Sequence, residues 1–264
     1  MTATCQRWRE RRDSYRPARE VVDTRGLDVA ELDELTAKAF VTRHHYSHRF
    51  PAARFRFGLY QRGELAGVAV FSRPFLATVL TNALNVANAN DGVELGRFVL
   101  LDEVGANAET WFLARCFAAL RGRVAGVVSF SDPFPRRTLD GREVFAGHIG
   151  TIYQAHNARY LGTTGAQTLR LLPDGTVFSN MASGKIRRAL SGWRSAASEL
   201  ERFGAEPLSS VSDPAARVAW LDHWRDTLTR PMRHRGLHRY AWSLDRRASV
   251  LPSAVGSYPK KEAV

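Results

Sequence analysis

Cysteine, lysine and long apolar runs are scarce in this sequence, and these shortages limit what the protein can be. Among 264 residues only Cys5 and Cys116 are cysteines, too few for a disulfide framework or a thiolate metal cage. No apolar run approaches the roughly 20 residues that a membrane span requires. The charged start of the chain, from Gln6 to Arg12, lacks the apolar stretch of a signal peptide. We therefore expect a cytoplasmic protein without a membrane partner.

Positive charge is abundant instead. The chain carries a formal net charge of +12, which favours a polyanionic partner such as nucleic acid. Lysine occurs only at positions 38, 185, 260 and 261, so nearly all of the cations are arginine. A GC-rich genome would explain arginine in place of lysine, but it would not create an excess of positive over negative charge. The charge balance therefore favours nucleic-acid binding over compositional bias.

The apolar pattern along the chain is that of an α+β protein. It predicts a helix that Asp28 caps, a hairpin of strands 55–60 and 65–71, a strand over 94–101, a helix over 107–122, a buried strand over 124–130 and a second hairpin over 168–178. Beyond residue 184, helices are predicted over 185–203 and 213–229, followed by a basic tail. We therefore divide the chain into a basic arm at 1–26, an α+β domain at 27–183 and a basic helical extension at 184–264.

The stretch from Gly150 to Gly162 is the most informative local feature. It reads as a short helix that begins after a glycine, presents Tyr153 and continues into a strand. Upstream, a strand ends at Asp132, just before a proline. A phenol and a carboxylate at the ends of neighbouring elements can move a proton and orient a nucleophile. The alternatives are that Tyr153 packs into the core as a buried tyrosine and that Asp132 only begins a turn.

Arg97 lies inside a predicted strand, where a buried charge needs a partner. Glu94, Asp132 or a substrate phosphate would serve. The strand continues through a small-residue loop into the helix that begins near Asn107. Free backbone N–H groups at such a helix start can bind a pyrophosphate, although an ordinary strand-to-helix connection explains the pattern equally well.

Three histidines, His44, His45 and His48, lie close together near the end of the first predicted helix. They could be the exposed end of that helix, or part of a metal site. In the second case His45, Tyr46 and Tyr153 are the expected ligands, and iron is a candidate metal.

Four motifs carry a resemblance to a known family: His44-His45-Tyr46-Ser47-His48, Leu95-Gly96-Arg97-Phe98, Ser131-Asp132-Pro133 and Gly150-Thr151-Ile152-Tyr153-Gln154-Ala155-His156-Asn157. The order of elements resembles the Gcn5-related N-acetyltransferase (GNAT) fold. The motifs, over roughly residues 28–180, resemble the Mom family, which hypermodifies adenine in phage DNA and protects it against host restriction. The resemblance implies a GNAT-like fold, with a mixed and mostly antiparallel central sheet flanked by helices. It also implies that the protein, if phage-encoded, acts in the cytoplasm of the host cell.

The resemblance also implies partners and roles. The partners are double-stranded DNA and a coenzyme A thioester, acetyl-CoA or a related acyl-CoA. The catalytic residues are Tyr46, Arg97, Asp132 and Tyr153, and the substrate-binding residues are His45, Ser47, Phe50, Ser131 and Asn157. The cofactor-binding residues are Phe98, Val99, Leu100, Asn107, Ala108, Glu109 and Thr110. Their loop departs from the usual GNAT Arg/Gln-x-x-Gly-x-Gly/Ala pattern.

The chemistry constrains the mechanism. Adenine N6 is a weak nucleophile and is paired in a duplex, so the base must be extruded and stacked on an aromatic face. Tyr46, Phe50 and Tyr153 are candidates for that face. The Mom product is a carbamoylmethyl or methylcarbamoyl group, which contains a nitrogen that acetyl-CoA lacks. Two other functions stay open: a GNAT-type acetyltransferase for a protein or small amine, and a non-catalytic DNA-binding protein on a decayed acyltransferase scaffold.

Overall fold

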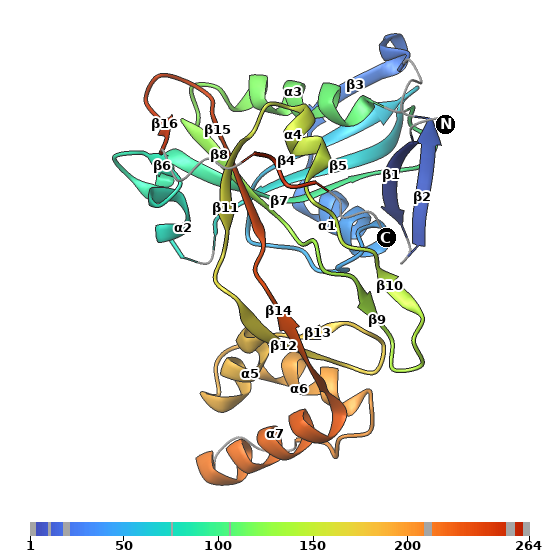
Figure 1. Cartoon of the computed structure of the whole chain (residues 1–264), viewed down its shortest axis with the longest axis vertical. Coiled ribbons are helices and arrows are strands. Elements are labelled where there is room, and N and C mark those ends of the chain that lie inside the picture. Colours follow the sequence, from blue (N-terminus) through green and yellow to red (C-terminus); the bar gives the residue numbers. More distant parts are fainter. Residues whose placement is uncertain are drawn as a thin grey trace. The chain divides into compact units, whose positions relative to one another are not determined.

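Two separately packed units make up the chain in the computed structural model (Figure 1). The structure describes residues 22–74, 76–105, 107–208, 213–251 and 257–260, together with the backbone of 4–9 and 12–17. One unit, which we call the sheet unit, comprises Met1–Pro133, Ala146–Thr164 and Leu237–Val264. The other, the helical unit, comprises Phe134–Phe145 and Gly165–Gly236.

A seven-stranded sheet forms the centre of the sheet unit. Its order is β11-β15-β8-β7-β5-β4-β3, with bounds β3 Leu27–Glu31, β4 Ala53–Gln61, β5 Glu64–Ser72, β7 Gly92–Leu100, β8 Gly126–Ser131, β11 Arg159–Thr163 and β15 His238–Ser243. Every neighbouring pair is antiparallel except β7 and β8, which run parallel. The predicted α+β class, with a mixed and mostly antiparallel sheet, is therefore confirmed.

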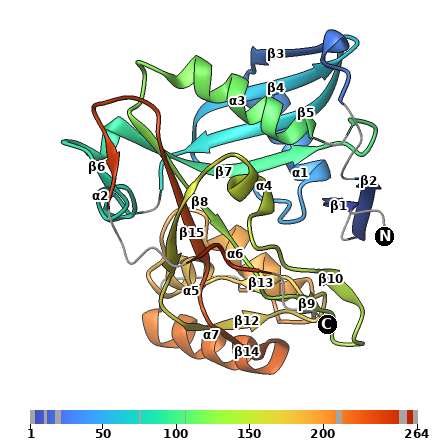
Figure 2. The ribbon, with the colours of Figure 1, turned by 45° about the horizontal axis from the view of Figure 1, so that its top comes forward.

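Helices cover both faces of this sheet. α3 (Ala108–Leu120) lies over β4 and β5 in Figure 2 and buries Phe112, Cys116 and Phe117 against the sheet. α1 (Glu34–His44) packs on the opposite face, where Val41 belongs to a separate core cluster with Val70. Period-two alternation in the strands sends side chains to both faces, so each face needs a helical cover.

Shorter elements complete the sheet unit. They are α2 (Thr78–Thr81), α4 (Thr151–Ala155), the paired strands β6 (Leu84–Asn85) and β16 (Ser249–Val250), the 3-10 helices Thr24–Gly26 and Ala89–Asp91, and the hairpin of β1 (Thr4–Arg9) and β2 (Arg12–Pro17). Of the predicted basic arm at 1–26, residues 1–3, 10–11 and 18–21 lie outside the described residues.

The helical unit has its own core. A three-stranded sheet of order β13-β12-β14 is accompanied by three helices: β12 Gln167–Leu171, β13 Val177–Phe178, β14 Arg230–His234, α5 Asn180–Arg187, α6 Trp193–Glu201 and α7 Pro214–Leu228. A small hairpin of β9 (Arg136–Arg137) and β10 (Glu143–Phe145) belongs to the same unit. Phe178, Ile186, Leu200 and Leu221 meet in its interior.

Three predictions from the sequence need correction. The first helix begins at Glu34 with Asp33 as its N-cap, because residues 27–31 pair with β4 instead. The predicted helix over 185–203 is broken between α5 and α6, where Ala189 and Gly192 have φ values of 51° and 82°. Residues 230–243, expected in a helical extension, form β14 and β15, and β15 pairs with β8 and β11 in the central sheet.

Candidate active site

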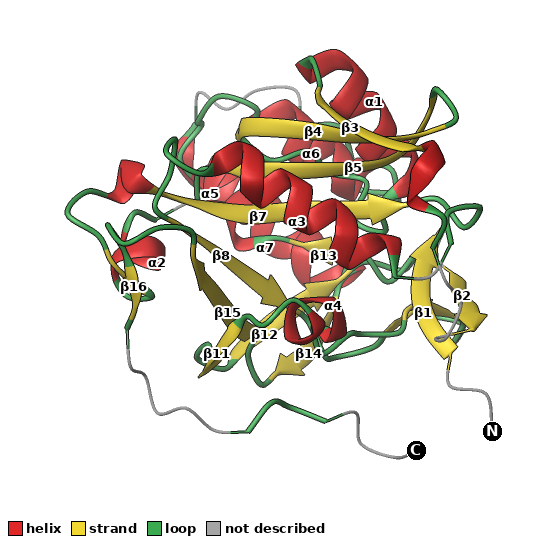
Figure 3. Cartoon of the chain, turned by 90° about the horizontal axis from the view of Figure 1, so that it is seen from above, coloured by secondary structure: helices red, strands yellow, loops and turns green. Residues whose placement is uncertain are grey.

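The parallel strands β7 and β8 separate part-way along their length. They pair only at Gly92–Gly126, Val93–Val127 and Glu94–Val128, and Figure 3 shows them diverging beyond that point. The Ser129 hydroxyl donates to the Leu95 carbonyl at 3.1 Å, just past the last pair. Ligands commonly bind where neighbouring strands of a sheet separate at their carboxyl ends. The opening between β7 and β8 is therefore a candidate ligand-binding site.

A bulge in β7 brings two charged residues to the same face at this opening. Leu95 pairs with Phe71 and Arg97 pairs with Val70, so Gly96 is the extra residue. The bulge lets Glu94 and Arg97 share a face although they are three positions apart. A Cβ on Gly96 would lie 2.5 Å from Ser72 Oγ, so this position requires glycine.

Arg97 is held by the backbone and by opposite charge. Its Nε donates to the Arg49 carbonyl at 2.8 Å and its Nη1 to the Gly96 carbonyl at 2.5 Å. Burial lowers the pKa of Arg97, while the charges of Tyr46 and Glu94 raise it. An arginine remains protonated at neutral pH in such surroundings. Of the partners considered for this side chain, Glu94 acts on Arg97 through its charge, without an ion pair between the two side chains among the described residues.

Tyr153 lies on α4 with its ring deep in the unit. It is 8% exposed, and its ring packs edge-on against Tyr240 and Trp242 at centroid distances of 5.4 and 5.6 Å. Its hydroxyl bonds to the Ser129 side chain, and burial raises the pKa of Tyr153 to about 12. Tyr153 therefore keeps its proton at neutral pH and can donate it, and it cannot serve as a phenolate base.

His148 links Tyr46 to Tyr153. Its ring centroid lies 6.4 Å from that of Tyr46 and 6.5 Å from that of Tyr153, edge-on in both cases. The His148 N–H donates to the Asp132 carbonyl at 2.7 Å, which ties this segment to the end of β8. The sequence reasoning missed His148, and its position two residues before Gly150 was the available signal.

His45 is buried beside this cluster in its neutral form. The Ser47 N–H donates to His45 Nδ1 at 3.1 Å, and the Ser47 hydroxyl lies 2.9 Å from the same atom. Because Nδ1 accepts, the hydrogen-bond pattern assigns the proton of the neutral ring to Nε2. Burial, reinforced by the charges of Arg97 and His148, holds the pKa of His45 well below its ordinary value. The Tyr46 ring stacks on it at 4.2 Å.

Iron ligation by His45, Tyr46 and Tyr153 stays a prediction. Within the described part of the chain, no group of three or more His, Cys, Asp or Glu side chains could hold a metal ion. A site here would therefore depend on the tyrosine oxygens together with His45.

Asp132 has a different charged neighbour. Its carboxylate raises the pKa of His238 against the lowering effect of burial, and His238 Nδ1 lies 2.9 Å from the Tyr160 hydroxyl. The charge of Glu94, in contrast, acts on Tyr153. The structure thus brings Tyr46, Arg97 and Tyr153 together with Glu94, and it connects Asp132 to them through the backbone bond to His148.

The other predicted substrate-binding residues have structural roles. Phe50 packs against the α1 side of the sheet. Ser131 is 1% exposed and lies beside the Tyr240 hydroxyl. Asn157 is exposed and adopts a φ of 57° in the turn after α4, a conformation that asparagine tolerates well. Substrate binding by these three residues stays a prediction.

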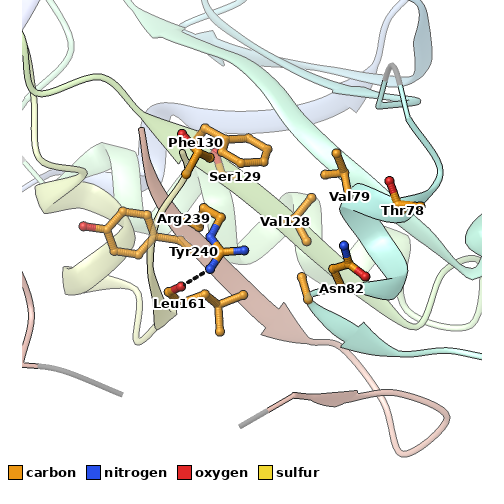
Figure 4. Close-up of a pocket in the computed structure, with 11 residues that line it drawn as sticks. Thr78, Val79, Asn82, Val128, Ser129, Phe130, Leu161, Arg239 and Tyr240 are labelled. Atoms are coloured by element: carbon orange, nitrogen blue, oxygen red, sulfur yellow. Dashed lines mark hydrogen bonds between the residues drawn. The ribbon is translucent and has the colours of Figure 1, made fainter. Parts of the chain in front are cut away.

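A cavity of about 150 Å³ lies beside β8, whose residues Val128, Ser129 and Phe130 line it (Figure 4). Ser129 and Tyr240 line it and also contact Tyr153, so they form a shared wall. Arg239 donates from Nη2 to the Leu161 carbonyl at 2.6 Å, while its buried Nε has no partner among the described groups. Apolar side chains line most of the remainder: Val79, Ala83, Val128, Phe130 and Leu161.

The model of the Mom protein family matches residues 26–260. The chain belongs to the Mom protein family. The match extends well past the predicted limit near residue 180, and it includes β14 and β15.

The chain was also compared with curated proteins and with solved structures. No curated protein matches the chain. Among solved structures, it is similar to a tandem GNAT protein from the clavulanic acid biosynthesis pathway, solved without AcCoA, with 9% sequence identity and a TM-score of 0.35. That match covers 76% of this chain and 65% of the other.

The predicted coenzyme A site is the junction between β7 and α3. The side chains of Val99 and Leu100 are buried in core clusters of the sheet unit, and Phe98 is half-buried against one of them. Asn107 is the N-cap of α3 with a φ of 72°, and Thr110 Oγ1 donates to its carbonyl at 3.1 Å.

The charge of this junction opposes a pyrophosphate. Asp102, Glu103 and Glu109 lie in the loop and the first turn, and no lysine or arginine occurs between Arg97 and Arg115. Ala108 and Glu109 are both buried, so a carboxylate already lies where the helix N-terminus favours negative charge. The residues at this helix start do not fit a pyrophosphate, and coenzyme A binding there stays a prediction.

No helix in the described residues is both long and apolar enough to cross a membrane.

Proposed function

We propose that this protein modifies the N6 amine of adenine in double-stranded DNA with a carbamoylmethyl or methylcarbamoyl group, and so protects the DNA against restriction. The family supports the target. The observation that supports catalysis is the grouping of Tyr153, Glu94 and Arg97 where β7 and β8 separate. This grouping offers a proton donor, a proton acceptor and a fixed positive charge.

Glu94 is the proposed proton acceptor. The adenine amine is conjugated to its ring, so its attack needs removal of an N6 proton as the new bond forms. Burial raises the pKa of Glu94, and the charge of Arg97 lowers it. A carboxylate with a raised pKa is a stronger base than an exposed one. Tyr46, next to Arg97, is the proposed stacking face for the extruded base.

The steps assigned to Tyr153 and Arg97 are those of a methylcarbamoyl transfer. N6 attacks the carbonyl carbon of a methylcarbamoyl donor, the bond from that carbon to the leaving group breaks, and the nitrogen of the product comes from the donor. Tyr153 keeps its proton at neutral pH, so its hydroxyl donates that proton to the leaving group as the donor breaks. Ser129, which bonds to Tyr153 and donates to the Leu95 carbonyl, holds the hydroxyl in place. Arg97, fixed by two backbone carbonyls, stabilises negative charge on the acyl oxygen. We assign no step to coenzyme A.

Nucleoside analysis tests this function. Plasmid DNA from cells that express the protein is digested, and its nucleosides are separated and weighed by mass spectrometry. We expect a modified deoxyadenosine that is absent from cells without the protein. Only unmodified deoxyadenosine, with the protein soluble and folded, would contradict the proposal. Acetylated cellular protein in the same cells would then favour the N-acetyltransferase alternative.

A further inference from the structure

The turn between α5 and α6 in the helical unit is strongly basic. Residues 175–198 contain no aspartate or glutamate, yet they include four cations: Lys185, Arg187, Arg188 and Arg194. Such a one-signed stretch in a chain of net charge +12 is a candidate contact for a polyanion.

Three of these cations have no ion pair among the described residues. Arg187 is the exception, because its Nη2 lies 2.8 Å from Asp222 Oδ1. Other nearby carboxylates of the unit are also occupied: Asp226 pairs with Arg170 at 3.0 Å and Asp174 with Arg202 at 3.0 Å. Lys185, Arg188 and Arg194 therefore form a basic patch without acidic partners, which we call the α5–α6 patch.

The backbone of the turn gathers these side chains. The Leu190 N–H donates to the Lys185 carbonyl at 2.9 Å. Lys185 Nζ lies 3.2 Å from the position that a Cβ on Gly192 would take, and Arg188 Nη2 lies 3.2 Å from the corresponding position on Gly184. Both glycines thus leave room for a long cationic side chain against the backbone.

Hydrogen-bonding groups accompany the charge. The Arg194 guanidinium lies over the Trp193 ring at 4.6 Å. Ser191 is exposed in the turn and Ser195 is exposed in the first turn of α6. Lysine, arginine and serine are the side chains that most often contact DNA phosphates. No carboxylate on this turn would repel such a phosphate.

We propose that the α5–α6 patch binds the phosphate backbone of duplex DNA. This inference rests on the proposed function, since it assigns that DNA a docking surface in the helical unit. Contacts to phosphates position a protein on the duplex without reading sequence. The patch therefore contributes affinity that depends on salt and is uniform across sequences.

The salt dependence of DNA binding tests the proposal. Fluorescence anisotropy with a labelled duplex gives Kd at several salt concentrations for the full chain and for a triple variant, Lys185→Gln, Arg188→Gln and Arg194→Gln. Each lost phosphate contact lowers the slope of log Kd against log salt by about 0.9, so the slope falls by about 2.7. A control variant, Lys38→Gln, Arg73→Gln and Arg121→Gln, removes the same charge from exposed positions of the sheet unit and keeps the full slope.

The outcomes separate this inference from the proposed function. An unchanged slope in the patch variant, or an equal fall in the control variant, would overturn the inference while adenine modification by the wild type stands. A fall confined to the patch variant would support it even if no modified adenine is found. A charge-conserving variant, Lys185→Arg, Arg188→Lys and Arg194→Lys, keeps the slope near the wild-type value, which separates lost charge from lost fold.

Discussion

Glu94 and Arg97 lie on the same face of β7 because Gly96 forms a bulge between them. In a regular strand, residues three apart point to opposite faces. The bulge therefore places a carboxylate and a guanidinium on one face of β7, where each charge shifts the pKa of the other group. The catalytic proposal depends on this local irregularity.

Gly96→Ala tests the bulge. The new Cβ would lie 2.5 Å from Ser72 Oγ, so we expect a loss of about 1–3 kcal/mol in the free energy of unfolding and a fall in adenine modification. Chemical denaturation and nucleoside analysis measure the two effects. Adding Ser72→Ala removes the clashing oxygen and restores part of the stability.

Gly165→Ala is the matched control, because no heavy atom lies within 4 Å of its added Cβ. Equal losses in the two single variants would show that the clash at Gly96 does not decide stability.

We expect the ionisation of Glu94 to determine how the rate of adenine modification falls at acid pH. Burial raises its pKa, so Glu94 keeps its proton to higher pH than an ordinary glutamate. Activity that needs its ionised form rises with pH through that raised value, while the stability contributed by the protonated form is lost over the same range. The rate of adenine modification measured against pH checks this. We expect Glu94→Gln to remove most activity, and a full rate with an unchanged profile in this variant would refute the role.

We expect the aromatic packing around Phe117 to contribute strongly to the free energy of unfolding of the sheet unit. Its ring contacts Phe71, His156 and Trp242 at centroid distances of 6.2, 5.0 and 5.2 Å. Phe117→Ala leaves a cavity among these rings, so we expect a loss of about 3–5 kcal/mol in the free energy of unfolding. Urea denaturation measures it, and a loss below about 1 kcal/mol would mean that this core is not packed as described.

The acidic junction before α3 predicts weak binding of coenzyme A. Like charges at Glu109 and on a pyrophosphate repel each other, so Glu109→Gln strengthens any binding at this helix start. Calorimetric titration with acetyl-CoA checks the direction. Tight binding that is insensitive to Glu109→Gln would show that the coenzyme binds in another way.

Local patterns predicted much of the fold. The predicted hairpin of strands 55–60 and 65–71 forms as β4 and β5, and Arg62 and Gly63 in its turn both have positive φ. Helices were predicted to start at 107 and 213, and α3 and α7 begin there with Asn107 and Asp213 as their N-caps. These elements depend on turn and cap residues that act over a few positions.

Features that depend on distant partners escaped prediction. β15 was hidden because arginines and histidines surround the apolar residues Tyr240, Ala241 and Trp242, and its pairing with β8 joins distant parts of the chain. The motif around Tyr153, which we propose to be catalytic, was visible from its residues. Glu94 was considered only as a partner of Arg97, because strict alternation does not reveal a bulge, and His148 carried no periodic signal.

The most direct test of the central claim is the amount of modified adenine made by Tyr153→Phe. Ser129 keeps its bond to the Leu95 carbonyl in this variant, so loss of one hydroxyl costs only about 1 kcal/mol of stability and the protein stays folded. Tyr60→Phe removes a hydroxyl from β4 in the same way and serves as the control. We expect Tyr153→Phe to lose nearly all modified deoxyadenosine, whereas Tyr60→Phe retains it. Wild-type levels of the modified nucleoside from Tyr153→Phe would contradict the account.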